Sequence, residues 1–425
     1  MSIEYLAISP HDPIIARDGR PFGKNQGIRM RSLDWPYPSV LAGSLRTMLG
    51  KMNGGFINET VKKLLDIDVA GPLPMKGMQL YLPVPKDILV KKADGKRIAI
   101  PLRPAKMADG DGCDLPVDSL LPAMIPNSVD EDFKPEKLPA FWSMNKMTAW
   151  LANPNGSDFP ISPELTAKGD EGNEDEENCE KDDLDFLNSP QKDERVHTGI
   201  KPETGAAEDG LLFMSVGLDL GTRCQGNEVR MAARADVTGV FEKEIVELDE
   251  IHPFGGERRL AHWARVDEPD GWRCPDDLLK KLESSDSKKI RMVLATPAIF
   301  SKGWLPGWLN LKKLSDGNEV FEGTPPNALD NPKLRLVSAC VDRWKPISGW
   351  SAEKTSRGPK EIRRLVPAGS VYFFEAKNAK DASVLAKSHW LRSVCDDPQV
   401  RKDGFGLAVW GIWEEAKDED IKNKW

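Results

Sequence analysis

The segment DGFGLAVWGIW, Asp403–Trp413, decides how the last part of this chain folds. Gly404 and Gly406 stand one residue apart, and residues that favour strands follow them. Residues 381–394, just before the segment, have the apolar spacing of an amphipathic helix. Two such glycines let a backbone turn tightly and approach another molecule closely. The segment therefore predicts a glycine-rich loop between a last helix and a last strand, suited to holding a phosphate chain.

Other elements are predicted on both sides of this chain's middle. A helix starts near Ser39 after two prolines, and its apolar face comprises Leu41, Leu45, Met48, Leu49 and Met52. Strands are predicted at residues 3–9, 211–220, 229–237, 290–296, 334–341, 370–375 and 407–413. The Pro-rich residues 76–163 predict loops and short strands, and residues 276–283 a short charged connection at a domain boundary. The second half thus resembles part of a ferredoxin-like βαββαβ unit, and the first half has room for another, with the Ser39 helix as its first helix.

Length and composition indicate a two-domain protein without a membrane span or a zinc site. With 425 residues the chain is long enough for two domains, and no apolar run approaches the roughly 20 residues that span a bilayer. The start, MSIEYLAISPHDP, lacks the features of a secretory signal, so we expect a cytoplasmic protein without membrane partners. The six cysteines are scattered without metal or disulfide spacing, which argues against a zinc site.

The net charge of -8 comes from one acidic run at residues 169–185. Without residues 170–185 the chain has 58 basic and 57 acidic residues, so local clusters decide its partners. We expect the run to be disordered or a solvated loop. A tolerated insertion is the favoured interpretation, and self-inhibition by mimicry of a nucleic-acid backbone is the alternative.

The strongest basic cluster is RDGRPFGKNQGIRMR, residues 17–31, between the first strand and the Ser39 helix. Its cations are Arg17, Arg20, Lys24, Arg29 and Arg31. Cationic heads on a backbone with three glycines suit phosphate contacts, with glycine amides as further donors. A solvated loop is the alternative interpretation.

Four other segments combine cations with glycine or an aromatic residue. The additional candidates for nucleic-acid contact are Arg46, His197, Lys201, Arg258, Arg259, Lys302, Trp304, Lys354, Arg357 and Lys360. Trp304 beside Lys302 can stack a base while the cation neutralises a phosphate, and it can equally be a hydrophobic lid. The last three lie in a long basic stretch, residues 344–364, between two strands, which can follow a single strand of RNA or simply be exposed.

No catalytic constellation stands out in the sequence. The chain has no phosphate-binding GxxxxGK[ST], no HExxH and no GxSxG motif, and its five histidines lack metal spacing. We therefore expect no enzyme activity, no metal and no cofactor.

Together the segments resemble the RAMP superfamily of CRISPR proteins, in particular the third subunit of the Cmr (type III-B) complex. The resemblance rests on RDGRPFG, WPYPSVLAGSLRT, FGGERR, TPAIFSKGWLP, ISGW, LVPAGSVYFFE and GFGLAVWG, in this order over nearly the whole chain. The acidic run and the Pro-rich middle depart from the family pattern.

The resemblance implies an α+β fold of two ferredoxin-like (RRM-like) domains with long loop insertions. Their expected bounds are 1–275, with the Pro-rich insertion and the acidic run, and 285–425, with the glycine-rich loop at 403–411. It implies a non-catalytic subunit that binds the 5′ handle of the crRNA and contacts the polymerase-like large subunit and the first backbone RAMP subunit. By the resemblance, the loop 17–31 contacts the handle, and Gly404 and Gly406 lie near RNA.

Two other functions stay open at this point. The first is a metal-independent RAMP endoribonuclease that processes precursor RNA, for which His197 or His11 with Lys24 are the candidates. The second is a structural adaptor that binds only protein.

Overall fold

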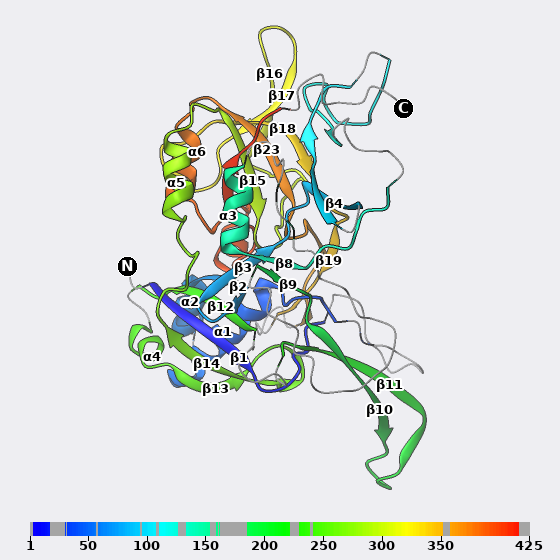
Figure 1. Cartoon of the computed structure of the whole chain (residues 1–425). Helices are drawn as coiled ribbons and strands as arrows, with labels where there is room; N and C mark the ends of the chain where they lie inside the picture. The colour runs from blue at the N-terminus through cyan, green and yellow to red at the C-terminus, as the bar shows by residue number, and fades with distance from the viewer. Residues whose placement is uncertain are drawn as a thin grey trace.

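The chain has a mixed α/β fold with few helices, and its paired strands are antiparallel in the computed structural model (Figure 1). The structure describes residues 3–17, 30, 32–56, 58–93, 96–107, 110–125, 133–153, 159, 161, 185–221, 229–238, 241–351 and 358–415. Of the acidic run at 169–185, only Asp185 belongs to these described residues, so the expected disorder of the run stays a prediction.

Eight strands form the first sheet, in the order β13-β14-β1-β12-β2-β3-β8-β9. Their bounds are Ile3–Pro10 (β1), Asp68–Lys76 (β2), Gln79–Pro83 (β3), Phe141–Ser143 (β8), Phe186–Leu187 (β9), Arg230–Asp236 (β12), Asp249–Pro253 (β13) and Leu260–Val266 (β14). β1 lies between β12 and β14, where Ala7 faces Ala232 on one side and Ala264 on the other. The predicted strands at 3–9 and 229–237 are thereby confirmed.

Two helices belong to this first sheet. The predicted Ser39 helix is α1, Pro38–Met52, with Pro38 in its first turn and an apolar face that contacts β2. Leu41, Leu45, Met48 and Leu49 are buried, whereas Met52 at the end of the helix is exposed. α2, Asn58–Asp66, packs against α1.

Seven strands form the second sheet, in the order β16-β17-β18-β23-β15-β25-β24. Their bounds are Lys289–Leu294 (β15), Leu309–Lys313 (β16), Glu319–Gly323 (β17), Leu334–Cys340 (β18), Val371–Ala376 (β23), Arg392–Ser393 (β24) and Leu407–Ile412 (β25). The strands predicted at 290–296, 334–341, 370–375 and 407–413 are confirmed. The expected helix that precedes the glycine loop is α6, Asp381–Ser388, and a shorter helix, α7, Pro398–Lys402, leads directly into the loop.

Three predictions of local structure are wrong. Residues 276–283 form helix α5, Asp276–Glu283, not a connection, because Leu278 and Leu282 are buried against α3 and α6. The helix predicted at 381–394 is shorter than expected, because α6 ends at Ser388 and β24 then pairs with β25. The Pro-rich stretch contains a regular helix, α3, Met144–Ala152, whose first turn is capped by the Ser143 hydroxyl accepting from the Lys146 amide.

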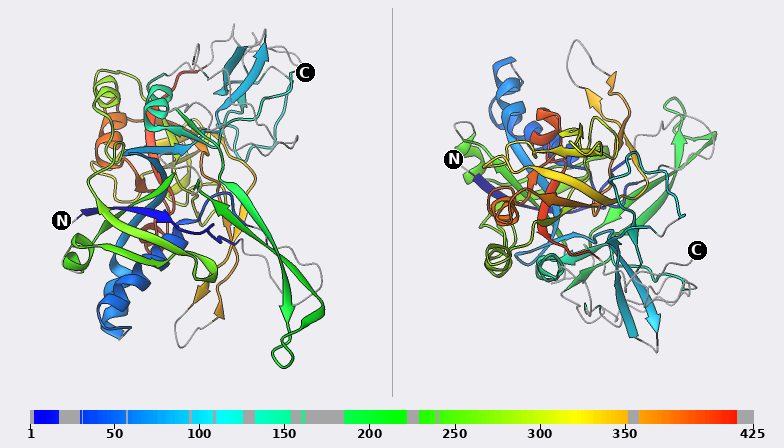
Figure 2. Two further views of the ribbon diagram at one scale, coloured as in Figure 1. Left: turned by 60° about the horizontal axis from the view of Figure 1, so that its bottom comes forward. Right: turned by 90° about the horizontal axis from the view of Figure 1, so that it is seen from above.

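The remaining elements are short helices and hairpins outside the two large sheets. They are α4 (Glu242–Val246), η1 (Gly256–Arg258), β4 (Ile88–Ala93), β5 (Lys96–Pro101), β6 (Arg103–Pro104), β7 (Ala123–Met124), β10 (Gln191–Ile200), β11 (Ala207–Asp219), β19 (Lys345–Ile347), β20 (Trp350–Ser351), β21 (Gly358–Pro359) and β22 (Arg363–Leu365). The strand predicted at 211–220 is confirmed as part of β11. The hairpin β10–β11 and the arm of β19–β22 and β20–β21 stand out from the body on the same side in both views of Figure 2.

One hydrophobic cluster runs through both sheets, from Leu6 in β1 to Trp413 after β25. A buried ion pair joins the halves inside it: Arg291 of β15 donates to Asp87 at 2.8 Å, and the two residues are 3% and 1% exposed. The Trp150 indole of α3 donates to the same carboxylate at 3.0 Å. The expected division at residues 275–285 stays a prediction. In the part of the chain that the structure describes, no helix combines the length and apolar character that crossing a membrane requires.

Candidate nucleic-acid interface

The two described ends of the basic loop 17–31 are fixed side by side on β11. The Ile14 amide donates to the Leu218 carbonyl at 2.9 Å, and the Met30 amide donates to the Met214 carbonyl at the same distance. Arg17 forms an isolated bridge with Ser32, and its side chain is exposed. The hairpin β10–β11 therefore anchors the loop at its root. Four other candidates, Arg20, Lys24, Arg29 and Arg31, lie outside the described residues.

The FGGERR turn packs against the first end of the same loop. The Gly256 amide donates to the Ile15 carbonyl at 2.8 Å. Glu257 and Arg258 both have left-handed φ angles, 57° and 53°, which non-glycine residues rarely adopt and which often mark functional turns. Arg258 is exposed, and the buried Nε of Arg259 has no hydrogen-bond partner among the described residues. The fold thus brings together two basic segments that are far apart in the sequence.

The hairpin β10–β11 carries His197 and Lys201. His197 faces Phe213 across the strand pair, with ring centroids 5.1 Å apart, and its Nε2 shares a hydrogen bond with the Ser215 hydroxyl at 2.7 Å. These cross-strand contacts account for the position of the imidazole within the hairpin. Lys201 is exposed at the tip, where its carbonyl accepts from the Gly205 amide at 2.9 Å.

Asp34 links the hairpin to the second half of the chain. One of its oxygens lies 3.0 Å from the ammonium of Lys192 in β10, and the other lies 3.7 Å from that of Lys345 in β19. The hairpin and the arm therefore lie side by side, which agrees with their common direction in Figure 2. Lys360, next to the pair β20–β21, is exposed on the arm. Lys354 and Arg357 lie outside the described residues.

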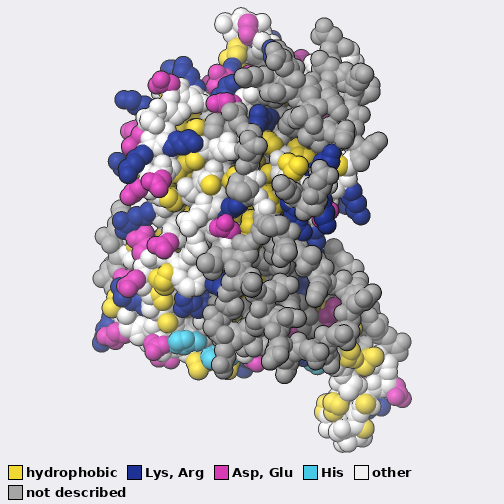
Figure 3. Space-filling view, viewed as in Figure 1, with side chains coloured by type: hydrophobic (Ala, Val, Ile, Leu, Met, Phe, Trp, Pro, Cys, Tyr) yellow, Lys and Arg dark blue, Asp and Glu magenta, His cyan; other side chains and the backbone are white. Residues whose placement is uncertain are grey.

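Lys302 and Trp304 occupy a loop after β15, as expected. Both are exposed and line a cavity of about 530 Å³ beside the root of the arm. The Lys302 ammonium donates to the Leu309 carbonyl at 2.6 Å, and the Tyr372 hydroxyl donates to the Trp304 carbonyl at 2.5 Å, so the loop is held in place. In Figure 3, Lys and Arg side chains gather beside apolar side chains in the region where Figure 1 places β4 and β19. We call Arg17, Lys201, Arg258, Lys302, Trp304 and Lys360 the exposed set.

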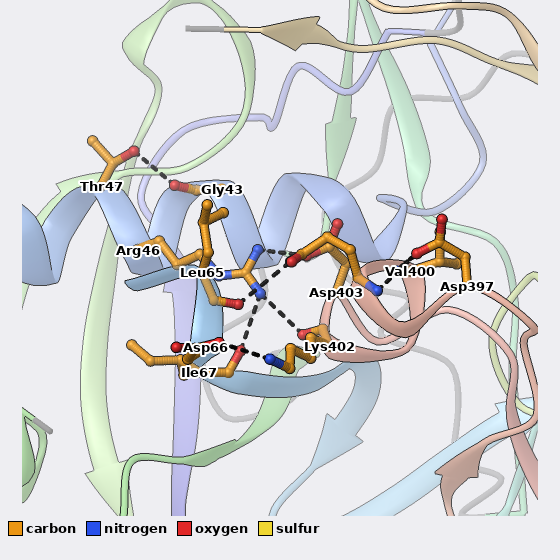
Figure 4. A network of polar contacts seen from close by, with 11 residues as sticks. Gly43, Arg46, Thr47, Leu65, Asp66, Ile67, Asp397, Val400, Lys402 and Asp403 are labelled. Carbon is orange, nitrogen blue, oxygen red and sulfur yellow. Dashed lines mark hydrogen bonds and ion pairs between the residues drawn. The ribbon is translucent and has the colours of Figure 1, made fainter. Parts of the chain in front are cut away.

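Arg46 belongs to a different environment. Its guanidinium donates to the Asp403 carboxylate, to the Ile67 carbonyl at 3.0 Å and to the Lys402 carbonyl at 3.1 Å (Figure 4). The Arg46 side chain is only 11% exposed and that of Asp403 19%. Close by, the Lys402 ammonium pairs with Asp66 at 2.8 Å. This contact between α1, β2 and α7, together with the glycine loop 404–406, is named the buried junction.

The glycine loop is packed inside the buried junction. Gly404 has a φ of 88°, and a Cβ there would lie 2.7 Å from the Val69 carbonyl of β2. At Gly406, with a φ of 68°, a Cβ would lie 2.5 Å from the Cys395 sulfur. Only glycine fits both positions, so the fold accounts for the motif through close packing.

The loop amides have acceptors within the chain. Gly404 donates to the Arg401 carbonyl at 3.0 Å, Phe405 to the Val400 carbonyl at 3.3 Å, and Gly406 to the Pro297 carbonyl at 2.8 Å. The Gly404 carbonyl accepts from the Thr296 hydroxyl at 2.8 Å. The expected cradle of loop amides for phosphate therefore has no support in the described hydrogen bonds, and a place near RNA stays a prediction.

The structure does not assemble a histidine centre among the described residues. His11 is exposed after β1, and His262 bonds to the Asp249 carboxylate across β13 and β14. In the described part of the chain, no three His, Cys, Asp or Glu side chains form a group that could hold a metal ion. Lys24, the expected partner of His11 or His197, lies outside that part.

Sequence reasoning did not single out three residues that line the cavity beside Trp304, namely Arg343, Trp344 and Arg364, although the last two bound the basic stretch 344–364. The adjacent pair Arg343-Trp344 repeats the cation-aromatic pattern of Lys302 and Trp304, and this signal could have identified it.

A family model described as "CRISPR-associated protein (Cas_Cmr3)" matches residues 6–413. No curated protein matches the chain significantly. Among solved structures, the chain is similar to a subunit of Type III-B Cmr-beta bound to cognate target RNA, with 14% identity, a TM-score of 0.44, and 87% of this chain and 86% of that chain covered. It is also similar to a chain of the Csm3–Csm4 subcomplex of the type III-A CRISPR-Cas interference complex, with 11% identity, a TM-score of 0.32, and 87% and 92% covered.

Proposed function

The chain belongs to the Cas_Cmr3 family of CRISPR-associated proteins, and on this premise we propose that it binds the 5′ handle of a crRNA as a subunit of a type III-B effector complex. The proposal rests on one observation above all. The ends of the loop 17–31, the FGGERR turn and the root of β10–β11 meet at residues 14–17, although they come from three distant parts of the sequence.

We infer that each half contains a ferredoxin-like unit. In the first sheet, the four strands of a βαββαβ unit are, in chain order, β1, β2, β12 and β14, and α1 follows the first of them. Their spatial order, β14-β1-β12-β2, is therefore 4-1-3-2. In the second sheet, β25-β15-β23-β18 gives the same order with α6 before the last strand. The hairpin β16–β17 stands where the first helix of the second unit is expected.

Cations that reach solvent from fixed loops suit an RNA backbone. Arg17, Arg258 and Lys201 are exposed, while the backbone that carries them is held by hydrogen bonds. Such cations neutralise phosphates, and fixing their backbone in advance lowers the entropy lost on binding. Trp304 adds an aromatic face for an unstacked base.

We propose that this subunit positions RNA and does not cut it. General acid-base cleavage needs two titratable groups within reach of one phosphodiester. His197 bonds to Ser215 and packs on Phe213, so its described contacts are those of a strand residue. We further propose that the polymerase-like large subunit and the first backbone subunit are its protein partners.

Charge removal on the exposed set tests the proposal. A variant with Arg17, Lys201, Arg258 and Lys360 changed to Gln is compared with a control in which Lys62, Lys63, Lys280 and Lys281 of α2 and α5 are changed to Gln. Each variant removes four positive charges from exposed side chains, so the two differ only in where the charges are lost. The readout is binding of RNA that carries the repeat-derived 5′ end, measured over a series of salt concentrations.

We expect the first variant to bind more weakly, with the slope of log affinity against log salt reduced by about 0.7 for each phosphate that is no longer neutralised. The control should keep the slope of the natural chain. Equal slopes in both variants would contradict the proposal, as would cleavage of the RNA in metal-free buffer that is abolished by His197→Gln.

A further inference from the structure

The cavity beside Trp304 has the composition of a binding site. It measures about 530 Å³, within the range of about 300–1,000 Å³ typical of ligand pockets. Apolar side chains make up much of its wall, and two tryptophans, Trp304 and Trp344, line it. These two are 37% and 48% exposed, whereas most large aromatic residues of this chain are buried in the core. The exposed indoles therefore offer stacking surfaces to a molecule from outside.

Cations surround the mouth of the cavity. Arg364 holds its guanidinium 5.0 Å from the centre of the Trp344 ring, which keeps that indole in place. Arg343 is exposed next to it, and Lys302 lies on the Trp304 side. Asp342, the acidic residue in the lining, is paired with Lys86 at 3.3 Å. The electrostatic field at the mouth therefore favours an anion.

We propose that this cavity holds one unstacked nucleobase of the bound RNA strand. The indoles of Trp304 and Trp344 contact the base faces, and Arg343 contacts the adjoining phosphate. The inference deepens the proposed function, because it assumes that the exposed set binds the same strand.

A double-mutant cycle, which combines one substitution in the protein with one abasic position in the RNA, identifies the base that enters the cavity. Full-length protein with Trp344→Ala is tested on synthetic RNAs with the repeat-derived 5′ end, each with one abasic position. We expect Trp344→Ala to weaken binding of intact RNA by about 5- to 100-fold. One abasic position should weaken the natural chain similarly, and combining the two changes should cost no more than either alone.

Leu311→Ala is the control, since Leu311 is an exposed residue on β16 outside the cavity lining.

Additive losses at every abasic position would overturn the inference. It would also be overturned if Trp344→Ala impaired only assembly with protein subunits, or if nucleoside 5′-monophosphates bound the cavity while no RNA position was coupled to it. If a coupled position appears but the repeat-derived end is bound no better than a scrambled RNA, the inference stands and the proposed handle function fails.

Discussion

The buried junction and the exposed set are built from the same kinds of residue, yet they do different things. Both combine arginine or lysine with nearby glycines. In the buried junction, Arg46 meets the carboxylate of Asp403 and two carbonyls, and Gly404 packs on Val69. In the exposed set, Arg258 and Lys201 reach solvent from turns that are held by their backbone.

The comparison shows that a cation near a glycine does not identify a phosphate site by itself. What separates the two regions is how far the cation is buried after folding, and Arg46 is buried against a carboxylate. For Arg46 that acid lies 357 positions further along the chain. We therefore expect changes in the buried junction and its surroundings to alter stability, and changes in the exposed set to alter RNA binding.

The largest effect is expected at the buried ion pair between the two halves. Asp87→Ala leaves the Arg291 guanidinium, 3% exposed, without its carboxylate. Removing one partner of a buried pair costs about 3–5 kcal/mol of unfolding free energy, measured by urea denaturation. The control Asp342→Ala breaks the exposed pair with Lys86 and should cost less than about 1 kcal/mol. Similar losses in both variants would contradict this difference between buried and exposed pairs.

Gly404→Ala should cause the second-largest loss of unfolding free energy. A side chain there adopts a φ of 88° and places its Cβ 2.7 Å from the Val69 carbonyl, so we expect a loss of about 2–4 kcal/mol. Gly317→Ala is a matched control, because Gly317 has a φ of 90° but open space around it. That control should cost about 1 kcal/mol. Equal thermal shifts for the two variants would show that packing at the junction is unimportant.

Arg46→Met tests the assignment of Arg46 to the interior. We expect a loss of about 1.5–3 kcal/mol, because its hydrogen bonds to Asp403 and the two carbonyls disappear. RNA affinity of the folded variant should equal that of the natural chain. Arg343→Met should show the reverse, with stability within about 0.5 kcal/mol and weaker RNA binding. A stable Arg46→Met variant with reduced affinity would move Arg46 to the exposed set.

The buried interior, unlike the exposed set, should also make the folding stability depend on pH. Burial, with the nearby cations Arg392 and Arg401, lowers the pKa of His389 from 6.5 to about 4. The unfolded chain therefore takes up a proton near pH 6.5 that the folded chain accepts only near pH 4. Stability should be complete above the unfolded pKa and fall by about 2 kcal/mol between about pH 7 and pH 4.5.

Urea midpoints over this pH range measure the effect. His389→Gln, which does not titrate, should flatten the dependence by that amount. An unchanged pH profile in the variant would assign the acid sensitivity to other groups.

Local patterns predicted much of the fold. Alternating or continuous apolar residues predicted β1, β15, β18, β23 and β25. A buried strand carries this pattern in its own sequence, because its apolar side chains are the ones that become buried. Helix α5 was missed because its eight residues show only three leucines among charges. Its helical state depends on Leu278 and Leu282 packing against α3 and α6, which are distant in the sequence.

The candidate site was less predictable for the same physical reason. The cationic segments were recognised from composition, but composition does not reveal that Gly256 bonds to Ile15 or that Asp34 joins Lys192 to Lys345. Composition also does not reveal that the acid paired with Arg46 lies 357 positions further along the chain.

The pairing of Arg46 with Asp403 has a consequence for the order in which the protein matures on the ribosome. At about 5–20 residues per second, synthesis of the 357 positions between them takes roughly 20–70 s. Throughout that interval the nascent first half lacks the loop that covers Val69 and neutralises Arg46. The first half therefore completes this part of its packing only after residue 404 has been made.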